Sequence, residues 1–248
     1  MKKITEFSEI SPLVLKYYKR GVITNNYLTP DDYKAEIKEG RLYFEECDQN
    51  LWIYVKRDGF YHLYFYILNS EAELPKSEDK LIAELPEKLM EFGEELGFVK
   101  LLDRISLKRE AQESEFEEIQ KASEDDAKRV MEILKSSFDE KCGDLPNLSK
   151  ISDECRDGLI MVTKTDGKIS GVLRFETGKT SAKIKHLAVD AKFRGMGLSK
   201  TLVGGFLASQ NGKNISVWTG KDNIPAINLY KSFGFSEDKN KSAVYMKG

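Results

Sequence analysis

The most informative segment of the chain is HLAVDAKFRGMGLSKTL, which runs from His186 to Leu202. An apolar strand leads into a glycine-containing turn, and the turn opens a helix. Gly195 and Gly197 remove side chains where a ligand must approach the backbone. The free N–H groups of a first helical turn, at the positive end of the helix, suit a phosphate or pyrophosphate. The pattern predicts an anion-binding turn; the alternative is that the glycines only shape a tight connection.

The charges around this turn favour the same class of ligand. The segment from 183 to 200 contains five basic residues and a single acidic one, Asp190. This excess of positive charge favours a polyanionic ligand. The turn is neither G-x-G-x-x-G nor a P-loop, so a dinucleotide-binding fold is disfavoured. The basic residues are Lys183, Lys185, Lys192, Arg194 and Lys200.

Two motifs in this region resemble those of the GCN5-related N-acetyltransferase (GNAT) family. The first, roughly V-x-x-x-[YF]-[RQ]-[RG]-x-G-[ILVA]-[GA], is matched from Val189 to Leu198 and departs at Ser199, which is still small. The second, N-x-x-A-x-x-L-Y-x-x-x-G-F, is matched from Asn223 to Phe235. The resemblance covers residues 115–248 and implies the family's fold, a mixed α/β acyl-CoA acyltransferase domain.

The resemblance also implies a donor and its binding residues. Acetyl-CoA, or a related acyl-CoA, is the expected co-substrate, and no metal is expected. The pantetheine arm is expected to pair like a strand with Leu187, Ala188 and Val189, and the amide of Leu187 to polarise the thioester carbonyl. Asn223 matches the residue that contacts this arm. The pyrophosphate is expected on the backbone amides of Arg194, Gly195, Met196, Gly197, Leu198 and Ser199.

Tyr230 matches the family's usual general acid. A phenol with a pKa near 10 stays neutral at rest and can protonate the leaving CoA thiolate. The alternative is that Tyr230 is only a packed aromatic residue on its helix.

The general base is less clear from the sequence. Glu176 is the first candidate. It lies on the expected strand 169–176, which precedes the strand that leads into the glycine turn. His186 is the second, but alternation places it opposite Lys185 and Leu187. A solvated or packed side chain is the alternative for both candidates, and a water relay is a third route.

Composition limits the function classes further. The chain has 248 residues, 39 basic and 41 acidic, with a formal charge of −2, which argues against a general nucleic-acid binder. We expect no membrane-spanning segment and no secretory signal. Three scattered cysteines and only two histidines suggest neither a disulfide framework nor a metal site, and they favour a reduced, cytoplasmic location.

The chain divides into two halves joined by the polar residues 110–118. We expect an N-terminal α/β domain at 1–110 and a catalytic GNAT domain at 111–248. Each half contains a three-strand meander, and a helix-Gly-Phe-strand echo around Gly97 and Gly234 suggests a tandem duplication with a degenerate first copy. The expected fold is therefore two tandem GNAT-like domains with mixed sheets.

The expected elements follow from capping, periodicity and turn signals. In the N-terminal meander one face is expected to be core and the other amphipathic, forming part of an acceptor pocket or a packed interface. Helices are expected at 12–19, 30–38, 78–84, 86–96, 124–138, after Gly195, and at 225–233. Strands are expected at 42–47, 51–56, 60–68, 98–107, 115–121, 159–164, 169–176, 182–189, 215–219 and 243–246.

These expectations combine into an N-acetyltransferase that moves an acetyl group from acetyl-CoA to a primary amine by direct attack. The acceptor is a small molecule or a peptide amine, and neither nucleic acid nor membrane is an expected partner. A homodimer is one expected state, because dimers are common in the family. The alternatives are a non-catalytic acyl-CoA-binding module and a tRNA-dependent aminoacyl transferase of related fold.

Overall fold

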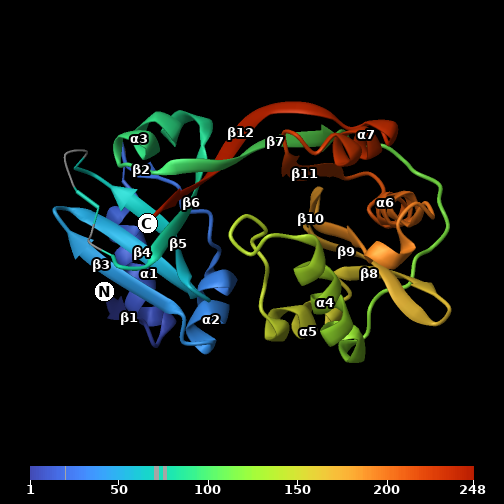
Figure 1. Ribbon diagram of the computed structural model, residues 1–248, viewed down its shortest axis with the longest axis horizontal. Helices are drawn as coiled ribbons and strands as arrows, with labels where there is room; N and C mark the ends of the chain where they lie inside the picture. The colour runs from blue at the N-terminus through green and yellow to red at the C-terminus, as the bar shows by residue number, and fades with distance from the viewer. Residues whose placement is uncertain (20, 70–72, 75–76) are drawn as a thin grey trace. The chain divides into compact units, whose positions relative to one another are not determined.

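The computed structural model describes residues 1–19, 21–69, 73–74 and 77–248. The chain forms two compact units, which are labelled by their elements in Figure 1. Unit 1 comprises Met1–Asp103 and Ser242–Gly248, and unit 2 comprises Arg104–Lys241. Two strands, β7 (Val99–Arg109) and β12 (Ser236–Lys247), contribute residues to both units.

Unit 1 is built on a mixed sheet in the order β1–β3–β4–β5–β6–β12, with β2 also paired to β5. Strands β3, β4 and β5 form the expected antiparallel meander, and β6 lies parallel to β5. Thr29 and Asp32 form a capping box at the start of α2, the helix expected at 30–38. The elements are β1 (Lys2–Lys3), α1 (Phe7–Tyr17), β2 (Ile23–Thr24), α2 (Pro30–Lys38), β3 (Leu42–Cys47), β4 (Asn50–Arg57), β5 (Phe60–Ile67), β6 (Lys80–Pro86) and α3 (Met90–Glu95).

Unit 2 is built on a mixed sheet in the order β12–β7–β11–β10–β9–β8. Strands β8, β9 and β10 form a second antiparallel meander, and β11 lies parallel to β10. The elements are α4 (Ala127–Ser137), α5 (Leu148–Arg156), β8 (Ile160–Thr165), β9 (Lys168–Thr177), β10 (Ser181–Val189), α6 (Leu198–Ser209), β11 (Asn214–Gly220) and α7 (Ile224–Ser232).

The two units repeat one order of elements. Each has two helices, an antiparallel meander, a strand parallel to the last strand of the meander, then a helix and a long strand. Unit 1 has β2 in addition between its first two helices, and unit 2 has α6 in addition before its parallel strand. The segment before the first helix also pairs with the first strand of the meander in both units, through β1 in unit 1 and through Lys121 opposite Met161 in unit 2. This shared order supports the predicted tandem duplication.

The second half of the long strand β12 belongs to unit 1, and the second half of β7 belongs to unit 2. Residues 242–247 of β12 pair antiparallel with β6 in unit 1, and residues 104–109 of β7 pair antiparallel with β11 in unit 2. β12 is therefore longer than the strand expected at 243–246.

Each sheet carries an apolar core on both faces. In unit 2 one cluster joins α6 and α7 to the sheet, and another joins α4 and α5 to it. In unit 1 the helix pair α1 and α2 covers one face, while Trp52 and Phe65 pack under α3 on the other. Both faces of the N-terminal meander are packed, since β4 from Asn50 to Val55 and all of β5 are buried, which agrees with the packed alternative and not with an acceptor pocket on this sheet.

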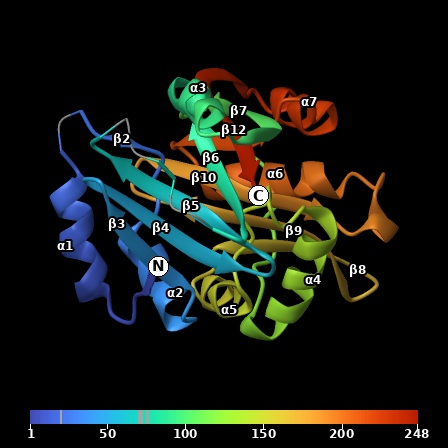
Figure 2. The same cartoon turned by 60° about the vertical axis from the view of Figure 1, so that its left-hand side comes forward.

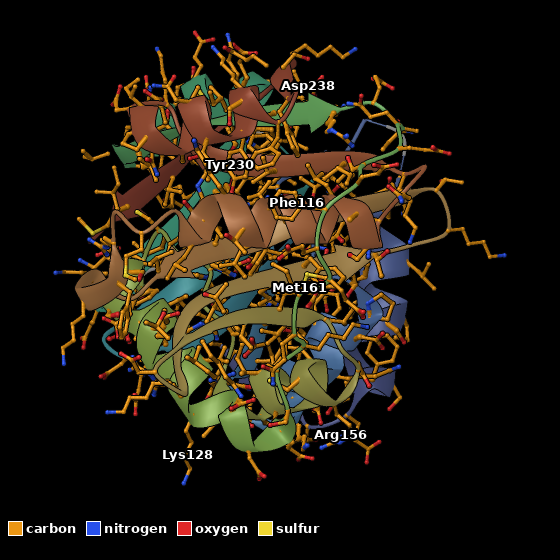
Figure 3. The ribbon with its side chains drawn as sticks, turned by 90° about the vertical axis from the view of Figure 1, so that its right-hand side faces the viewer. Phe116, Lys128, Arg156, Met161, Tyr230 and Asp238 are labelled. Atoms are coloured by element: carbon orange, nitrogen blue, oxygen red, sulfur yellow. The ribbon has the colours of Figure 1, made fainter. Side chains whose placement is uncertain are left out.

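Several expected elements differ in the structure. The helix expected at 78–84 is strand β6, because β5 and β12 pair with its two edges and bury Leu81, Ile82 and Ala83. The strand expected at 115–121 forms only the Lys121 bridge. Instead, its side chains Phe116 and Ile119 pack against Gly204 and Gly205 of α6, where an added Cβ would collide with them; Figure 3 shows the Phe116 segment crossing α6.

Helix boundaries also differ in two places. α1 begins at Phe7 rather than at Pro12, since Glu6 and Glu9 form a capping box ahead of it. Helix α5 was not expected, although Asn147 caps it by accepting a hydrogen bond from the amide of Lys150 at 2.6 Å.

Candidate acyl-donor site

Strand β10 has one fully paired edge and one partly open edge. It pairs with β9 from Ala182 to Val189. On the other edge it pairs with β11 only from Ser181 to Ile184, and a register shift interrupts β10 between Ile184 and His186. In the part of the chain that the structure describes, the edge of residues 187–189 that faces β11 has no strand partner.

The alternation of backbone groups decides which amides reach this open edge. The amide of Asp190 donates to the carbonyl of Ser170 in β9 at 2.9 Å. In an antiparallel pair every second residue bonds to its neighbour, so Ala188 also faces β9. The N–H and C=O groups of Leu187 and Val189 consequently point toward the gap between β10 and β11.

The glycine turn lies directly beyond this edge. Gly195 and Gly197 have φ values of +83° and +78°, and an added Cβ at either would meet no atom within 4 Å. Packing therefore does not require these glycines; their left-handed backbone does. The amides of Lys200 and Thr201 donate to the carbonyl of Gly197 at 2.9 and 3.2 Å, so the helical bonds of α6 start there and the amides before them are left for a ligand.

Asp190 fixes the turn to helix α4. Its carboxylate accepts a hydrogen bond from the amide of Lys192 at 3.0 Å and forms an ion pair with Arg129. The Lys192 amide and then the Arg129 guanidinium hold the pKa of Asp190 below its usual value. Arg129 was not found by the sequence reasoning, because no local pattern links α4 to a turn that lies sixty residues further along the chain.

Cationic side chains accompany the turn. Lys192, Arg194 and Lys200 are exposed, and Nε of Arg194 donates to the carbonyl of Val189 at 3.3 Å. Lys185, at the register shift of β10, is instead paired with Glu176 at 3.2 Å. The turn thus combines free amides, a helix N-terminus and exposed positive charge, which suit a diphosphate.

Tyr230 lies in the α6/α7 core cluster, against which Leu187 also packs. It is 4% exposed, and its ring contacts that of Phe235 at a centroid distance of 5.5 Å. Figure 3 labels Tyr230. Burial raises the pKa of Tyr230 well above its ordinary value, so the phenol is neutral at rest. This state allows it to donate a proton.

Asn223 caps helix α7. Its Oδ1 accepts a hydrogen bond from the amide of Ala226 at 3.3 Å. A contact between Asn223 and the pantetheine arm would therefore use its Nδ2 as a donor.

The two candidate bases lie in different surroundings. Glu176 lies opposite Lys183 in β9, four residues before Leu187 in the register of β10, which is a rise of roughly 13 Å. Its side chain is half-exposed and its partner is Lys185. The structure therefore does not bring Glu176 to the open edge at Leu187.

His186 belongs to a buried polar network. Its Nδ1 lies 3.3 Å from Nη1 of Arg174, and its Nε2 lies 2.7 Å from the carbonyl of Gly143. Arg174 also forms a bidentate ion pair with Glu154. Since Arg174 can only donate and the Gly143 carbonyl can only accept, the imidazole is neutral with its proton on Nε2.

This network argues against His186 as the general base. Burial and then the Arg174 charge lower the pKa of His186 to about 4, and both ring nitrogens are used within the protein. The network instead ties the connection between α4 and α5 to β9 and β10. Sequence reasoning missed Glu154 because α5 was not expected.

Within the residues the structure describes, no helix is long and apolar enough to cross a membrane. The same residues contain no group of three or more His, Cys, Asp or Glu side chains that could hold a metal ion.

Comparisons with known proteins agree with this geometry. Residues 127–235 match the model of the acetyltransferase (GNAT) family. No curated protein matches the chain. Residues 127–235 are therefore an acetyltransferase domain of the GNAT family, and the fold and family expected from the two motifs are confirmed.

Solved structures show that the likeness in fold extends beyond this domain. A GNAT-family acetyltransferase from Colwellia psychrerythraea aligns with a TM-score of 0.59 and 15% identity over 99% of this chain and 98% of its own. An N-acetyltransferase from Sphaerobacter thermophilus aligns with a TM-score of 0.56 and 14% identity over 89% and 86%. A tandem GNAT protein from the clavulanic acid biosynthesis pathway aligns with a TM-score of 0.55 and 12% identity over 84% and 83%.

Proposed function

We propose that the protein is an N-acetyltransferase that moves an acetyl group from acetyl-CoA to a primary amine, and that unit 2 carries the reaction. The observation that supports this most is the open edge of β10, which ends at a turn with free amides and exposed cations. An extended arm with amide groups would pair with this edge as a strand does, and a diphosphate would bind at the turn. Coenzyme A carries both groups in that order.

The donor would be held by main-chain groups. Leu187 and Val189 would pair with the pantetheine arm, while Ala188 would flank it, since its own backbone groups face β9. The amides from Arg194 to Ser199 would bind the diphosphate, with Arg194 and Lys192 adding charge. Asn223 would contact the arm through Nδ2.

The chemistry is a direct attack on the thioester. The neutral amine forms a bond from its nitrogen to the carbonyl carbon, and the amide of Leu187 stabilises the oxygen as it becomes negative. The carbon–sulfur bond then breaks, the thiolate takes a proton from Tyr230, and the proton lost by the amine goes to a base. Tyr230 recovers its proton from solvent before the next cycle.

The two routes for the amine proton are Glu176, which would receive it through water because it does not lie at the open edge, and a water relay without Glu176. If Glu176 is the base, Glu176→Gln removes the limb of the pH–rate profile that reports its ionisation. An unshifted profile would assign the proton to a water relay.

The finer assignments rest on this proposal. The acceptor is a small-molecule or peptide amine, the catalytic domain is residues 111–248 behind an N-terminal domain at 1–110, and the protein acts in the cytoplasm, with a homodimer as one state. The test is release of free CoA thiol from acetyl-CoA across an amine library. Thiol release with at least one amine supports the proposal; acetyl-CoA binding without release would indicate an acyl-CoA-binding module instead.

The same assay separates the third candidate function. A tRNA-dependent aminoacyl transferase would release no CoA thiol with any amine and would bind charged tRNA. The open edge and the glycine turn, both suited to acyl-CoA, favour the acetyltransferase.

A further inference from the structure

Unit 1 contains a second pair of parallel strands that diverge. β5 pairs with β6 from Phe60 to His62 and then separates from it, as β10 separates from β11 after Ile184. The other edge of β5 pairs with β4 along its whole length. Any further partner of β5 therefore lies on the β6 side, in the gap where the two strands diverge.

The chain itself fills this gap. β2 pairs with the end of β5, Ile23 opposite Ile67 and Thr24 opposite Tyr66, and Figure 2 shows β2 beside the end of β5. The hydroxyl of Thr24 donates to the carbonyl of Phe65 at 2.6 Å. The backbone groups that face the gap in unit 1 are thus bonded to a segment of the same chain.

Asn25 completes the filling with its side-chain amide. Its Oδ1 accepts a hydrogen bond from the amide of Phe65 at 2.8 Å, and its Nδ2 lies 3.0 Å from the carbonyl of Leu63. The same Nδ2 lies 3.2 Å from the carbonyl of Glu84 in β6, so one carboxamide bridges both diverging strands. Asn25 is 5% exposed, and its hydrogen bonds are within the protein.

We infer that the segment Ile23–Asn25 occupies in unit 1 the position that the pantetheine arm takes in unit 2, and that each chain therefore binds one acyl-CoA, in unit 2 alone. The inference rests on the proposed function for unit 2. A secondary amide of pantetheine offers the same donor and acceptor as the Asn25 carboxamide. Binding a second donor would require β2 and Asn25 to leave and would uncover buried backbone groups, which is costly.

The connection after β5 also supports the inference that unit 1 binds no acyl-CoA. Residues 68–79 join β5 to β6 and contain no glycine, whereas residues 190–213 join β10 to β11 and contain the glycine turn and α6. The sequence of 68–79 holds Lys76 as its single basic residue. This connection therefore has no glycine and one basic residue, where the corresponding connection of unit 2 has the glycines and cations proposed to bind the diphosphate.

The test counts bound donor on the full chain by equilibrium dialysis with radiolabelled acetyl-CoA. We expect one equivalent per chain, and we expect Gly197→Val to weaken binding at least about tenfold, because a side chain at φ +78° distorts the turn and crowds the phosphate. Gly59→Val in unit 1, at φ +75° and also in open space, is the matched control and should leave binding unchanged.

The possible results are distinct. Two equivalents per chain, or one equivalent that survives Gly197→Val, would overturn the inference and leave an acyl-CoA-dependent function standing. No uptake by the unaltered chain would overturn the proposed function itself.

A second measurement tests the filled gap directly. Asn25→Ala should speed hydrogen exchange of the Phe65 amide at least about tenfold, because it removes that amide's acceptor. Asn50→Ala removes the acceptor of the Leu68 and Asn69 amides and should leave Phe65 unchanged. If acetyl-CoA slows exchange at Phe65 in either protein, unit 1 binds the donor and the inference is wrong.

Discussion

The two units carry the same pair of diverging strands but place different things between them. In unit 1 the gap between β5 and β6 holds β2 and the Asn25 carboxamide. In unit 2 the edge of β10 stays open and leads to the glycine turn. The strand order is the same in both, so the order of strands does not decide whether a donor binds.

What differs is the chain that leaves the central strand. A short connection without glycine follows β5, while a glycine turn and helix α6 follow β10. In each unit the buried apolar side chains stabilise the sheet. This packing does not depend on which connection follows the central strand. The two units therefore share a strand order although their central strands are followed by different connections.

The largest expected effect is on turnover in unit 2. Tyr230→Phe should lower kcat by about 100- to 10,000-fold, because it removes the proton donor for the thiolate. The acetyl-CoA Kd should stay within about twofold, since the phenol acts on the leaving group and not on ground-state binding. Steady-state kinetics and calorimetry measure the two quantities.

Tyr245→Phe in unit 1 is the control for this change. Tyr245 is also fully buried, and its hydroxyl donates to Glu94 at 3.1 Å. Its loss should cost about 1 kcal/mol of unfolding free energy and leave kcat unchanged. An unaltered kcat in Tyr230→Phe would reject the acid role.

The next prediction concerns the free energy of unfolding and compares one ion pair in each unit. Glu154→Gln should lower the free energy of unfolding by about 3–5 kcal/mol, because Arg174 is 2% exposed and would keep a buried charge without its counter-ion. Glu36→Gln in unit 1 should cost about 1 kcal/mol, since Arg41 and Arg57 retain access to water. Urea unfolding measures the free energy of both variants. Equal losses of stability would contradict the conclusion that the Arg174–Glu154 pair is the more deeply buried of the two.

A smaller effect depends on pH. The pKa of His186 is lowered to about 4, against about 6.5 for an unfolded histidine. Between these values the unfolded chain binds the extra proton, so this contribution to stability is complete above about pH 6.5 and is lost as the pH falls toward 4.

His186→Gln keeps a carboxamide that can donate to Gly143 but removes the titration. The variant should therefore show a shallower loss of stability between pH 6.5 and 4 than the unaltered protein. Unfolding in urea at a series of pH values measures the slope, and an unchanged slope would mean that His186 is not the titrating group.

The sequence predicted the parts of unit 2 that are local. Gly195, Gly197 and the start of α6 follow from residues adjacent in the chain, as do helix α7 and the meander. The exact partners could not be predicted, because Arg129 meets Asp190 and Glu154 meets Arg174 only after the sheet has formed.

Pairing over long distances explains the main errors. Residues 78–84 have the composition of a helix, yet most of them form part of β6, which lies between β5 and β12. Ala83 of β6 pairs with Tyr245 of β12, which is far away in the sequence. Two strand partners outweigh local propensity there. The role of Asn25 was equally hidden, since nothing near Asn25 in the sequence indicates that it bridges two strands.

The most direct test of the account follows amide hydrogen exchange by NMR during titration with acetyl-CoA. We expect slower exchange at Leu187 and Val189, whose amides face the open edge of β10, and no change at Leu63 or Phe65 in unit 1. Protection that appears in unit 1, or a titration that leaves Leu187 and Val189 unprotected, would contradict it.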